Sequence, residues 1–239
     1  MAINVNDVYQ TVLLILNKEQ RGYMTPTEFN TVATQVQLEI FEKYFDDLNQ
    51  QLRIPQADTD YADRQENIDE KLAIFKTFGT PTLVPNTDYF SLPTIDSYGD
   101  TVSFYRLGNL IHNSNKIIQR LDRHDFYYVD RSKLTKPTTL NPVYLYENQK
   151  LFIKPTSIVS DVTVDYIRKP NDIVWGFDVG GLGQYQYLNT KSQDFELHES
   201  EQTEIVLKIL LYSGIIIRDP QIVQAAAAQV QADEVNKKS

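Results

Sequence analysis

Three histidines are the side chains best suited to acid–base or metal chemistry in this sequence, and they lie far apart along the chain. His112, His124 and His198 fit neither HExxH nor another metal-binding spacing. His124 lies between Arg123 and Asp125, an arrangement that resembles a general-base pair, but no nucleophile motif accompanies it. We therefore expect ordinary surface or core roles for all three histidines.

Carboxylates cluster in the stretch DTDYAD, which has some of the spacing of a calcium-binding loop and includes Asp58 and Asp60. The EF-hand pattern needs an oxygen ligand where Ala62 stands and a glycine where Asp63 stands. The stretch is therefore predicted to be a solvated linker that caps the next helix. The chain has no cysteine, which excludes disulfides and thiolate metal sites. We expect no catalytic, metal or cofactor site, and no enzyme.

One glycine-rich stretch, GFDVGGLGQYQY from Gly176 to Tyr187, is the remaining candidate for chemistry. Its spacing matches neither GxGxxG nor a Walker loop, because Gln186 occupies the last glycine position and no GK[ST] follows. Two interpretations stay open: a floppy hairpin tip, or an arm that becomes ordered against a neighbouring subunit. In the second interpretation the expected anchors are Trp175, Phe177, Tyr185 and Tyr187.

The net charge argues against a protein whose main role is to grip nucleic acid. The 239 residues carry a formal charge of −9, whereas domains that bind nucleic acid are basic. The charge is uneven: residues 1–80 total −6, residues 81–198 total −1 and residues 199–239 total −2. A local basic patch in the middle segment is expected to be a solvated face, and the alternative is a contact for phosphate or an acidic partner. Its members are Lys116, Arg120, Arg123, Arg131, Lys133 and Lys136.

The bulk composition is that of an ordinary globular protein. Hydrophobic residues make up 41% of the chain and charged residues 23%, and the chain is long enough to bury a real core. The start, MAINVNDV, has no basic region typical of a signal peptide, and the apolar run VLLIL is far too short to span a bilayer. We expect a soluble protein made in a cytoplasm, without membrane contact.

The first third of the sequence predicts helices. Val5, Val8, Val12 and Ile15 recur at helical spacing, with Gly22 as a stop. The tetrapeptide TPTE then predicts a strong helix start, because its first threonine can cap, its proline suits the first helical position and its glutamate completes a capping box. An apolar stripe continues this second helix to about residue 53, and a third helix is predicted over residues 61–78.

From Pro81 onward, proline and glycine punctuate short β-branched and aromatic runs, which predicts strands. The segment VYLYENQKLFIKP, residues 143–155, alternates on either side of Glu147 to Lys150 and predicts a β-hairpin. The segment VTVDYIR, residues 162–168, predicts a further strand. Aromatic side chains on both faces of these strands are typical of a small sandwich or barrel with a partly covered outside.

Helices are predicted again near the end. Ser200 can cap a helix that stops at Gly214, and Asp219-Pro220 starts a last helix through four consecutive alanines. Three isoleucines lie between these two helices, and consecutive residues point in different directions, so no single neighbour can cover all three. We expect another copy of the chain or a partner to do so. The candidate interface residues here are Ile215, Ile216, Ile217, Arg218, Ile222, Ala226 and Val230.

The predicted fold class is therefore α+β: N- and C-terminal helices form a helical bundle, and an antiparallel β-rich domain is inserted between them. The predicted parts are residues 1–80 for the N-terminal helices, residues 81–198 for the β-rich domain and residues 199–239 for the C-terminal helices. Terminal helices that share one bundle would leave the β-rich domain projecting from it.

The order of these segments resembles the head–tail connector proteins (adaptor or ring proteins) of short-tailed bacteriophages, especially crAss-like phages. The matching features are the N-terminal helices with TPTE, the hairpin VYLYENQKLFIKP, the strand VTVDYIRKP, and an ending that matches over FELHESEQTEIVLKILLYSGIIIRDPQIVQ. An Ala-rich helix and a Lys-rich stop follow that ending. The resemblance does not extend to residues 55–120.

The resemblance implies a structural virion protein made in the host bacterial cytoplasm and located in the connector region of the tail. Such adaptors form a twelvefold ring under the portal, extend the DNA channel and bind the next tail ring or hub protein. By position, residues 219–239 would reach towards the portal. An acidic channel wall would also repel DNA phosphates, so that the genome slides past without sequence-specific binding.

A second function class stays open at this point. The 15 tyrosines and Trp175 would also suit a tail-associated module that binds host-surface glycan through its aromatic β-rich part. A hydrolase is a third class, but the sequence supplies no paired acid and base for it.

Overall fold

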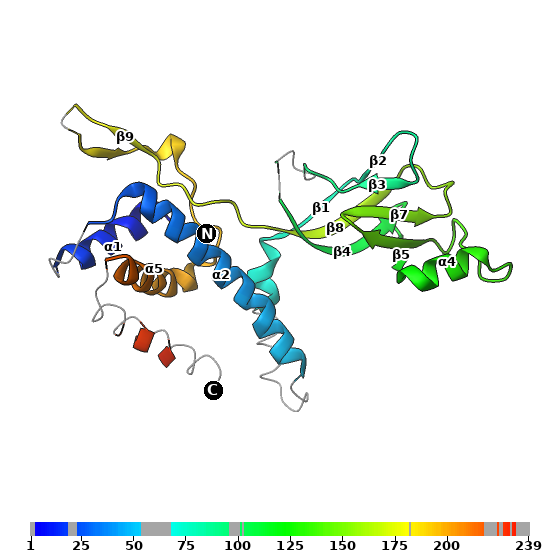
Figure 1. Cartoon of the computed structure of the whole chain (residues 1–239), viewed down its shortest axis with the longest axis horizontal. Coiled ribbons are helices and arrows are strands. Elements are labelled where there is room, and N and C mark those ends of the chain that lie inside the picture. Colours follow the sequence, from blue (N-terminus) through cyan, green and yellow to red (C-terminus); the bar gives the residue numbers. More distant parts are fainter. Residues whose placement is uncertain are drawn as a thin grey trace. The chain divides into compact units, whose positions relative to one another are not determined.

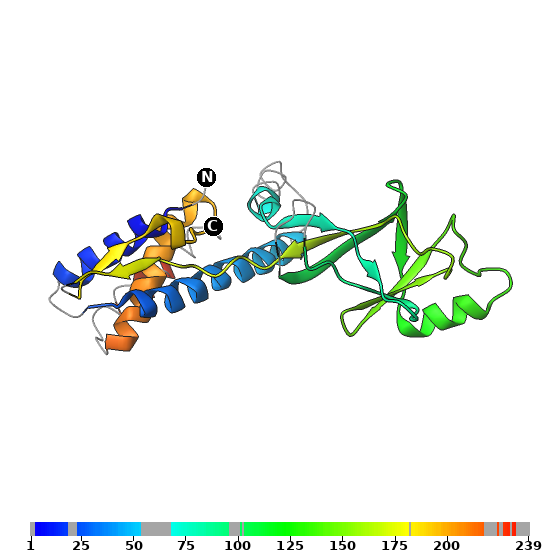
Figure 2. The same ribbon diagram turned by 90° about the horizontal axis from the view of Figure 1, so that it is seen from above.

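The computed structural model describes residues 3–18, 23–53, 68–95, 101, 103–181, 183–217, 224, 227–229 and 231–232. The chain divides into two compact units, each described here by itself. Unit 1 combines Met1–Ile74 with Pro170–Ser239, and unit 2 is Phe75–Lys169. Figures 1 and 2 show the helices of unit 1 and the strands of unit 2.

Helix α2 (Pro26–Arg53) begins where the sequence predicts, and helix α1 (Val5–Lys18) precedes it. The backbone N–H of Thr25 donates to Glu28 Oε2 at 2.9 Å, and the backbone N–H of Glu28 donates to Thr25 Oγ1 at 3.3 Å. This reciprocal pair is a capping box, which satisfies two donors at the helix start. The Thr25 hydroxyl also donates to Glu28 Oε2 at 2.7 Å, and this bond, together with the one from the Thr25 backbone N–H, holds the pKa of Glu28 below its ordinary value. The predicted helix start is confirmed.

Helix α5 (Gln202–Ile217) packs on α1 and α2 and does not stop at Gly214 as predicted. One glycine costs a helix only about 1 kcal/mol relative to alanine, and the apolar residues around it favour continuation. A short 3₁₀ turn, η2 (Glu199–Glu201), precedes α5. His198 caps this turn by accepting from the Ser200 backbone N–H at 3.2 Å, so the cap is two residues earlier than predicted.

The predicted third helix is wrong at its C-terminal end. Residues 68–73 are helical, but strand β1 (Lys76–Gly79) occupies the last predicted turn. Exposed and buried residues alternate along β1, as in a strand with one inward face, and β1 pairs antiparallel with β8 (Val162–Arg168). Tertiary pairing therefore overrides the local helical pattern here.

Unit 2 is built on one eight-stranded sheet with the order β1-β8-β4-β5-β6-β7-β3-β2. Neighbouring strands are antiparallel except β5 and β6, which are parallel. The remaining strands are β2 (Thr82–Leu83), β3 (Tyr89–Ser91), β4 (Phe104–His112), β5 (Lys116–Arg120), β6 (Val143–Glu147) and β7 (Lys150–Lys154). Helix α4 (Arg123–Arg131) lies in the connection between β5 and β6.

This architecture corrects the predicted fold class. The protein is a mixed α/β protein with a large curled sheet, and not a helical bundle that carries a small antiparallel β-rich insertion (Figure 1). The first part of β5 pairs with β4 and its last two residues pair with β6, which joins two groups of strands into one sheet. A parallel pair needs a long connection, and the segment with α4 supplies it.

The predicted hairpin of residues 143–155 and the predicted strand of residues 162–168 are both confirmed as β6, β7 and β8. Asn148 and Gln149 form the two-residue hairpin turn with φ angles of 50° and 57°. Positive φ at both positions is typical of the type I′ turn, whose twist matches that of the flanking strands.

The curled sheet encloses an apolar core. Along β8, buried and partly buried residues alternate, as expected of a strand with one inward face. The core residues are Phe90, Leu110, Ile118, Tyr144, Leu151, Ile153, Ile158, Val162, Val164 and Tyr166. On the other face of β6, Val143 and Leu145 pack against Phe126 of α4. Both faces of β6 are therefore covered, as the sequence predicted for part of the outside.

Residues 170–198 belong to unit 1, although composition placed them in the β-rich part. They contain strands β9 (Phe177–Val179) and β10 (Tyr185–Tyr187) and the 3₁₀ turn η1 (Asn189–Lys191). The segment is fixed to α2 by backbone-to-side-chain hydrogen bonds: the N–H of Ile173 donates to Thr34 Oγ1 at 3.0 Å, and that of Glu196 donates to Gln37 Oε1 at 2.9 Å. A buried amide group and a partly buried hydroxyl group on α2 thus help decide where this segment lies.

Among the helices of the described residues, none has the length and apolar character needed to cross a membrane.

Candidate functional site

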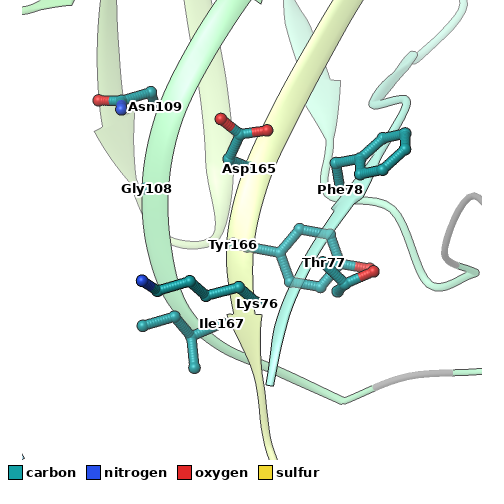
Figure 3. A pocket seen from close by; sticks show the side chains of 8 residues that line it. All are labelled: Lys76, Thr77, Phe78, Gly108, Asn109, Asp165, Tyr166 and Ile167. Atoms are coloured by element: carbon teal, nitrogen blue, oxygen red, sulfur yellow. The ribbon is translucent and has the colours of Figure 1, made fainter. Parts of the chain in front are cut away.

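A cavity of about 440 Å³ opens where β4 bulges away from β8 in unit 2 (Figure 3). The pairing of β4 with β8 shifts between Leu107 and Leu110, so Gly108 and Asn109 face the single residue Asp165. A Cβ on Gly108 would lie 2.8 Å from the backbone oxygen of Asp165. Only glycine fits this close approach, which shapes one side of the cavity.

The cavity brings together polar and apolar side chains from three strands. Its lining is Lys76, Thr77, Phe78, Gly108, Asn109, Asp165, Tyr166 and Ile167. Thr77 lies opposite Tyr166 in the β1–β8 pairing, and Phe78 lies opposite Asp165, so the two pairs occupy opposite faces of the sheet. Figure 3 shows Thr77 beside the Tyr166 ring. Thr77 Oγ1 is buried and has no hydrogen-bond partner within the described part of the chain.

The lining can bind a small polar ligand, but it does not form a catalytic pair. Asp165 is its one carboxylate and Lys76 its one ammonium group. General acid–base chemistry on a stable bond usually needs two titratable groups with different roles near the reacting atoms. An exposed ring beside a carboxylate and an amide is instead an arrangement that suits hydrogen bonding and stacking.

A second hollow, of about 600 Å³, lies along helix α4 of the same unit. We call its lining residues, His124, Tyr127, Tyr128, Arg131 and Ser132, the α4 face. Tyr127 is 54% exposed and Tyr128 is 71% exposed. The His124 ring stacks on the Tyr128 ring with 6.3 Å between centroids.

Helix α4 is fixed to the sheet through its other side. Phe126 is buried against β6. Arg123 pairs with Glu147 at 3.3 Å, and Asp130 pairs with Lys154 at 3.8 Å. The buried Phe126 and these two ion pairs attach the helix to the sheet, so that the α4 face lies on the other side of the helix.

The sequence-predicted anchors of the 176–187 stretch form an aromatic cluster inside their own unit. Trp175 is only 5% exposed, and its Nε1–H donates to Asn6 Oδ1 at 3.1 Å. Its ring lies 4.5 Å from the Tyr9 ring between centroids, and Phe177 and Tyr187 flank it at 6.0 Å and 5.6 Å. Trp175 therefore fixes the β9–β10 hairpin to the chain's own helices. It presents no open ring face to a sugar.

Tyr185 is the predicted anchor that stays most accessible. It is 40% exposed and meets Phe177 edge-on at 5.0 Å. The pairing of β9 with β10 shows that this stretch forms a hairpin, which fits both interpretations of it. Whether Tyr185 contacts a neighbouring subunit stays a prediction.

The C-terminal interface candidates fall at or beyond the end of the described chain. The backbone of Ile215, Ile216 and Ile217 belongs to α5, but their side chains lie outside the described residues. Arg218, Ile222, Ala226 and Val230 also lie outside them, as does the DTDYAD stretch. Their proposed contacts with a subunit or portal stay predictions.

The three histidines do not come together. His112 is buried, with Nδ1 3.2 Å from the backbone oxygen of Asp161, while His124 and His198 are exposed. Across the described residues, no group of three or more histidine and carboxylate side chains is arranged to hold a metal ion.

A buried charge network between α2 and α5 was missed by the sequence analysis. Lys208, nearly fully buried, pairs with Glu39 of α2, and Lys43 of α2 pairs with Glu204 of α5 at 3.2 Å. Nearby, Lys71 pairs with Glu201. The signal was available: Glu201, Glu204 and Lys208 recur at helical spacing beside buried isoleucines.

Tyr44 lies beside this network with its hydroxyl buried. Burial raises the pKa of Tyr44 well above its ordinary value, and the charges of Glu201 and Glu204 raise it further. The Tyr44 hydroxyl has no hydrogen-bond partner within the described residues. The network supports the packing of unit 1.

Comparison of the sequence with known protein families and with curated proteins finds no match.

Proposed function

We propose that this chain is a structural virion protein that forms an oligomeric ring between portal and tail and extends the DNA channel. The observation that carries the proposal is the exposed apolar and aromatic surface of unit 2. Leu134 is 93% exposed and Leu140 is 71% exposed, and both follow the α4 face in the chain. The α4 face adds two exposed tyrosine rings to this unit, and extensive exposed apolar surface is typical of a contact with another protein.

The order of the sequence segments adds support of a different kind. TPTE, the hairpin VYLYENQKLFIKP and the strand VTVDYIRKP are the features that resemble phage connectors. Each of these segments folds as an intact structural unit here: a capped helix, a type I′ hairpin and a core strand. The overall charge of −9 suits a channel that DNA passes without binding.

Imaging tests this proposal directly. The purified full chain, alone and mixed with its portal protein, is examined by mass photometry and negative-stain electron microscopy. We expect rings, or ring-shaped density on the portal. A chain that stays monomeric at every concentration and binds neither portal nor virions contradicts the proposal. The variant Leu134→Asp is expected to form fewer rings, and Thr135→Asp, exposed at the next position, is the matched control.

The cavity at the β4 bulge favours a second candidate, the binding of a saccharide. Phe78 offers a half-exposed ring, and Asp165 and Asn109 offer hydrogen-bonding groups beside it. A glycan array probed with the full chain tests this candidate. Binding that is lost in Phe78→Ala and kept in Tyr185→Ala would support it, and an array without signal would count against it.

A further inference from the structure

The two units of the chain carry opposite formal charges. Unit 2 has 12 basic and 9 acidic side chains, a net charge of +3, while unit 1 has 11 basic and 23 acidic side chains, a net charge of −12. This difference in net charge appears when the chain is divided at the structural boundaries. It is smaller when the chain is divided at the boundaries predicted from composition. Like charges that face each other oppose association, and opposite charges steer two surfaces together.

These charges discriminate between the ways in which two copies can meet. A symmetric contact between two copies of unit 1 would place −12 against −12, and one between two copies of unit 2 would place two basic surfaces together. A contact between unit 2 of one copy and unit 1 of the next joins opposite signs. Such a contact uses a different patch on each side, so it is heterologous and can close into a ring.

The α4 face has the side chains that such a contact needs on unit 2. Tyr127 and Tyr128 supply rigid apolar area, and Arg131 supplies a positive charge on the same hollow. Tyrosine and arginine are enriched among the residues that dominate binding energy at protein interfaces. Lys133 follows as a further exposed cation.

Unit 1 presents carboxylates on the outer side of α2. Glu42 and Asp46 are exposed and lie one helical turn apart, so they share a face. Lys43 between them pairs with Glu204 of α5 at 3.2 Å. The exposed side of α2 is therefore negative, in keeping with the charge of the whole unit.

We infer that the α4 face of one copy binds the acidic helical unit of a second copy in a head-to-tail contact. This inference rests on the proposed ring and assigns the surface through which it forms. The tyrosine rings are buried at the contact, and Arg131 and Lys133 face carboxylates of unit 1. The occupant of the hollow is thus a second copy of this chain.

Two charge-reversed forms of the full chain test the contact. One carries Arg131→Glu with Lys133→Glu, and the other carries Glu42→Lys with Asp46→Lys. Each alone is expected to associate at least tenfold more weakly than the wild type, a change of about 1.4 kcal/mol. An equimolar mixture is expected to recover association, because opposite charges meet at every contact when the two forms alternate. A reversed α4 face then meets a reversed unit 1, and a native α4 face meets a native unit 1.

Several outcomes overturn the contact. The contact is contradicted if either reversed form associates as strongly as the wild type. It is also contradicted if the mixture does not recover association although both forms have the circular dichroism of the wild type. Lys116→Glu, at the start of β5, changes the charge of unit 2 by two units, as Arg131→Glu alone does, and is expected to leave association unchanged while Arg131→Glu alone weakens it. Tyr128→Ala removes apolar area without changing charge and is expected to weaken association as well; wild-type association in this variant would contradict the assignment.

The same measurements separate this inference from the function on which it rests. Wild-type rings that are insensitive to all these changes would overturn the α4 contact and leave the ring protein in place. A wild type that never associates, with or without portal, overturns both. If a reversed form misfolds, Arg131→Gln with Lys133→Gln gives the second measurement: it should weaken association and reduce its salt dependence. Unchanged salt dependence would contradict the contact.

Discussion

The two units of this chain use charged and apolar side chains in different ways. In unit 2, the core within the curled sheet is apolar, and the charged side chains of the described residues are exposed or partly exposed. In unit 1, the buried groups among the described residues include Glu204 and Lys208, which link α5 to α2, and Glu201, which pairs with Lys71. Removing one partner of a buried ion pair costs far more than removing a surface charge. Unit 1 should therefore be sensitive to changes of charge that unit 2 tolerates.

The largest expected effect is the loss of the aromatic anchor of unit 1. Trp175→Ala should lower the free energy of unfolding by about 3–5 kcal/mol, because the buried ring packs between Tyr9, Phe177 and Tyr187. Urea denaturation measures the loss, and hydrogen exchange should place it in unit 1. Trp175→Phe keeps a ring in place and should cost much less. Equal loss of protection in unit 2 would contradict the separation of the units.

The charge network gives the next largest effect. Lys208→Met should lower the free energy of unfolding by about 3 kcal/mol, because it leaves the buried Glu204 with one cation fewer. The double variant Lys208→Met with Glu204→Gln should recover part of this loss. Urea denaturation of the single and double variants measures their free energies of unfolding. If Lys150→Met on unit 2 costs as much, the contrast between the units is wrong.

The bulge in β4 is the corresponding weak point of unit 2. Gly108→Ala should lower the free energy of unfolding by about 2 kcal/mol, since the added Cβ meets the backbone oxygen of Asp165 at 2.8 Å. Hydrogen exchange should show the change in β4 and β8 while α2 and α5 keep their protection. Asn109→Ala, at the next and exposed position, serves as the control and should change little.

The smallest expected effect belongs to Tyr44 and depends on pH. Because the pKa of Tyr44 is raised in the folded chain, the unfolded state loses this phenol proton first, above about pH 10. The contribution of Tyr44 to stability is thus complete below that pH and falls as the pH rises. Tyr44→Phe should change the free energy of unfolding by less than about 1 kcal/mol at pH 8. Between pH 8 and about pH 10.5, the free energy of unfolding of the Tyr44→Phe variant should fall less than that of the wild type. An equal fall in both proteins would contradict the assignment.

Local sequence signals predicted single elements well and their partners poorly. TPTE, the Asn148-Gln149 hairpin and the strand over residues 162–168 all formed where predicted, since their signals lie within a few residues. The end of the third helix and the stop at Gly214 were wrong, because pairing with β8 and packing on α1 and α2 outweigh local propensity there. The fold class was wrong for the same reason: sequence alternation does not say which strands become neighbours.

The candidate sites divide in the same way. The aromatic character of residues 175–187 was visible, but only the structure shows that Trp175 turns inward to Asn6 and Tyr9. The sequence analysis included Arg131 of the α4 face in a basic patch, but it did not identify the tyrosines of that face. The cavity at Gly108 was not predicted, because it depends on a shift in pairing between β4 and β8.

The sequence by itself determined the capped start of α2, the hairpin of β6 and β7, the overall acidity and the absence of cysteine chemistry, because each of these depends on neighbouring residues or on composition. The tertiary structure decided that the basic charge gathers in the sheet unit and the acidic charge in the helical unit, with the boundary at residues 74/75 and 169/170. Hydrogen bonds from residues 173 and 196 to α2 move the segment after β8 into the helical unit. Contacts between residues more than a hundred positions apart therefore set the charge of each unit, and no local pattern contains them.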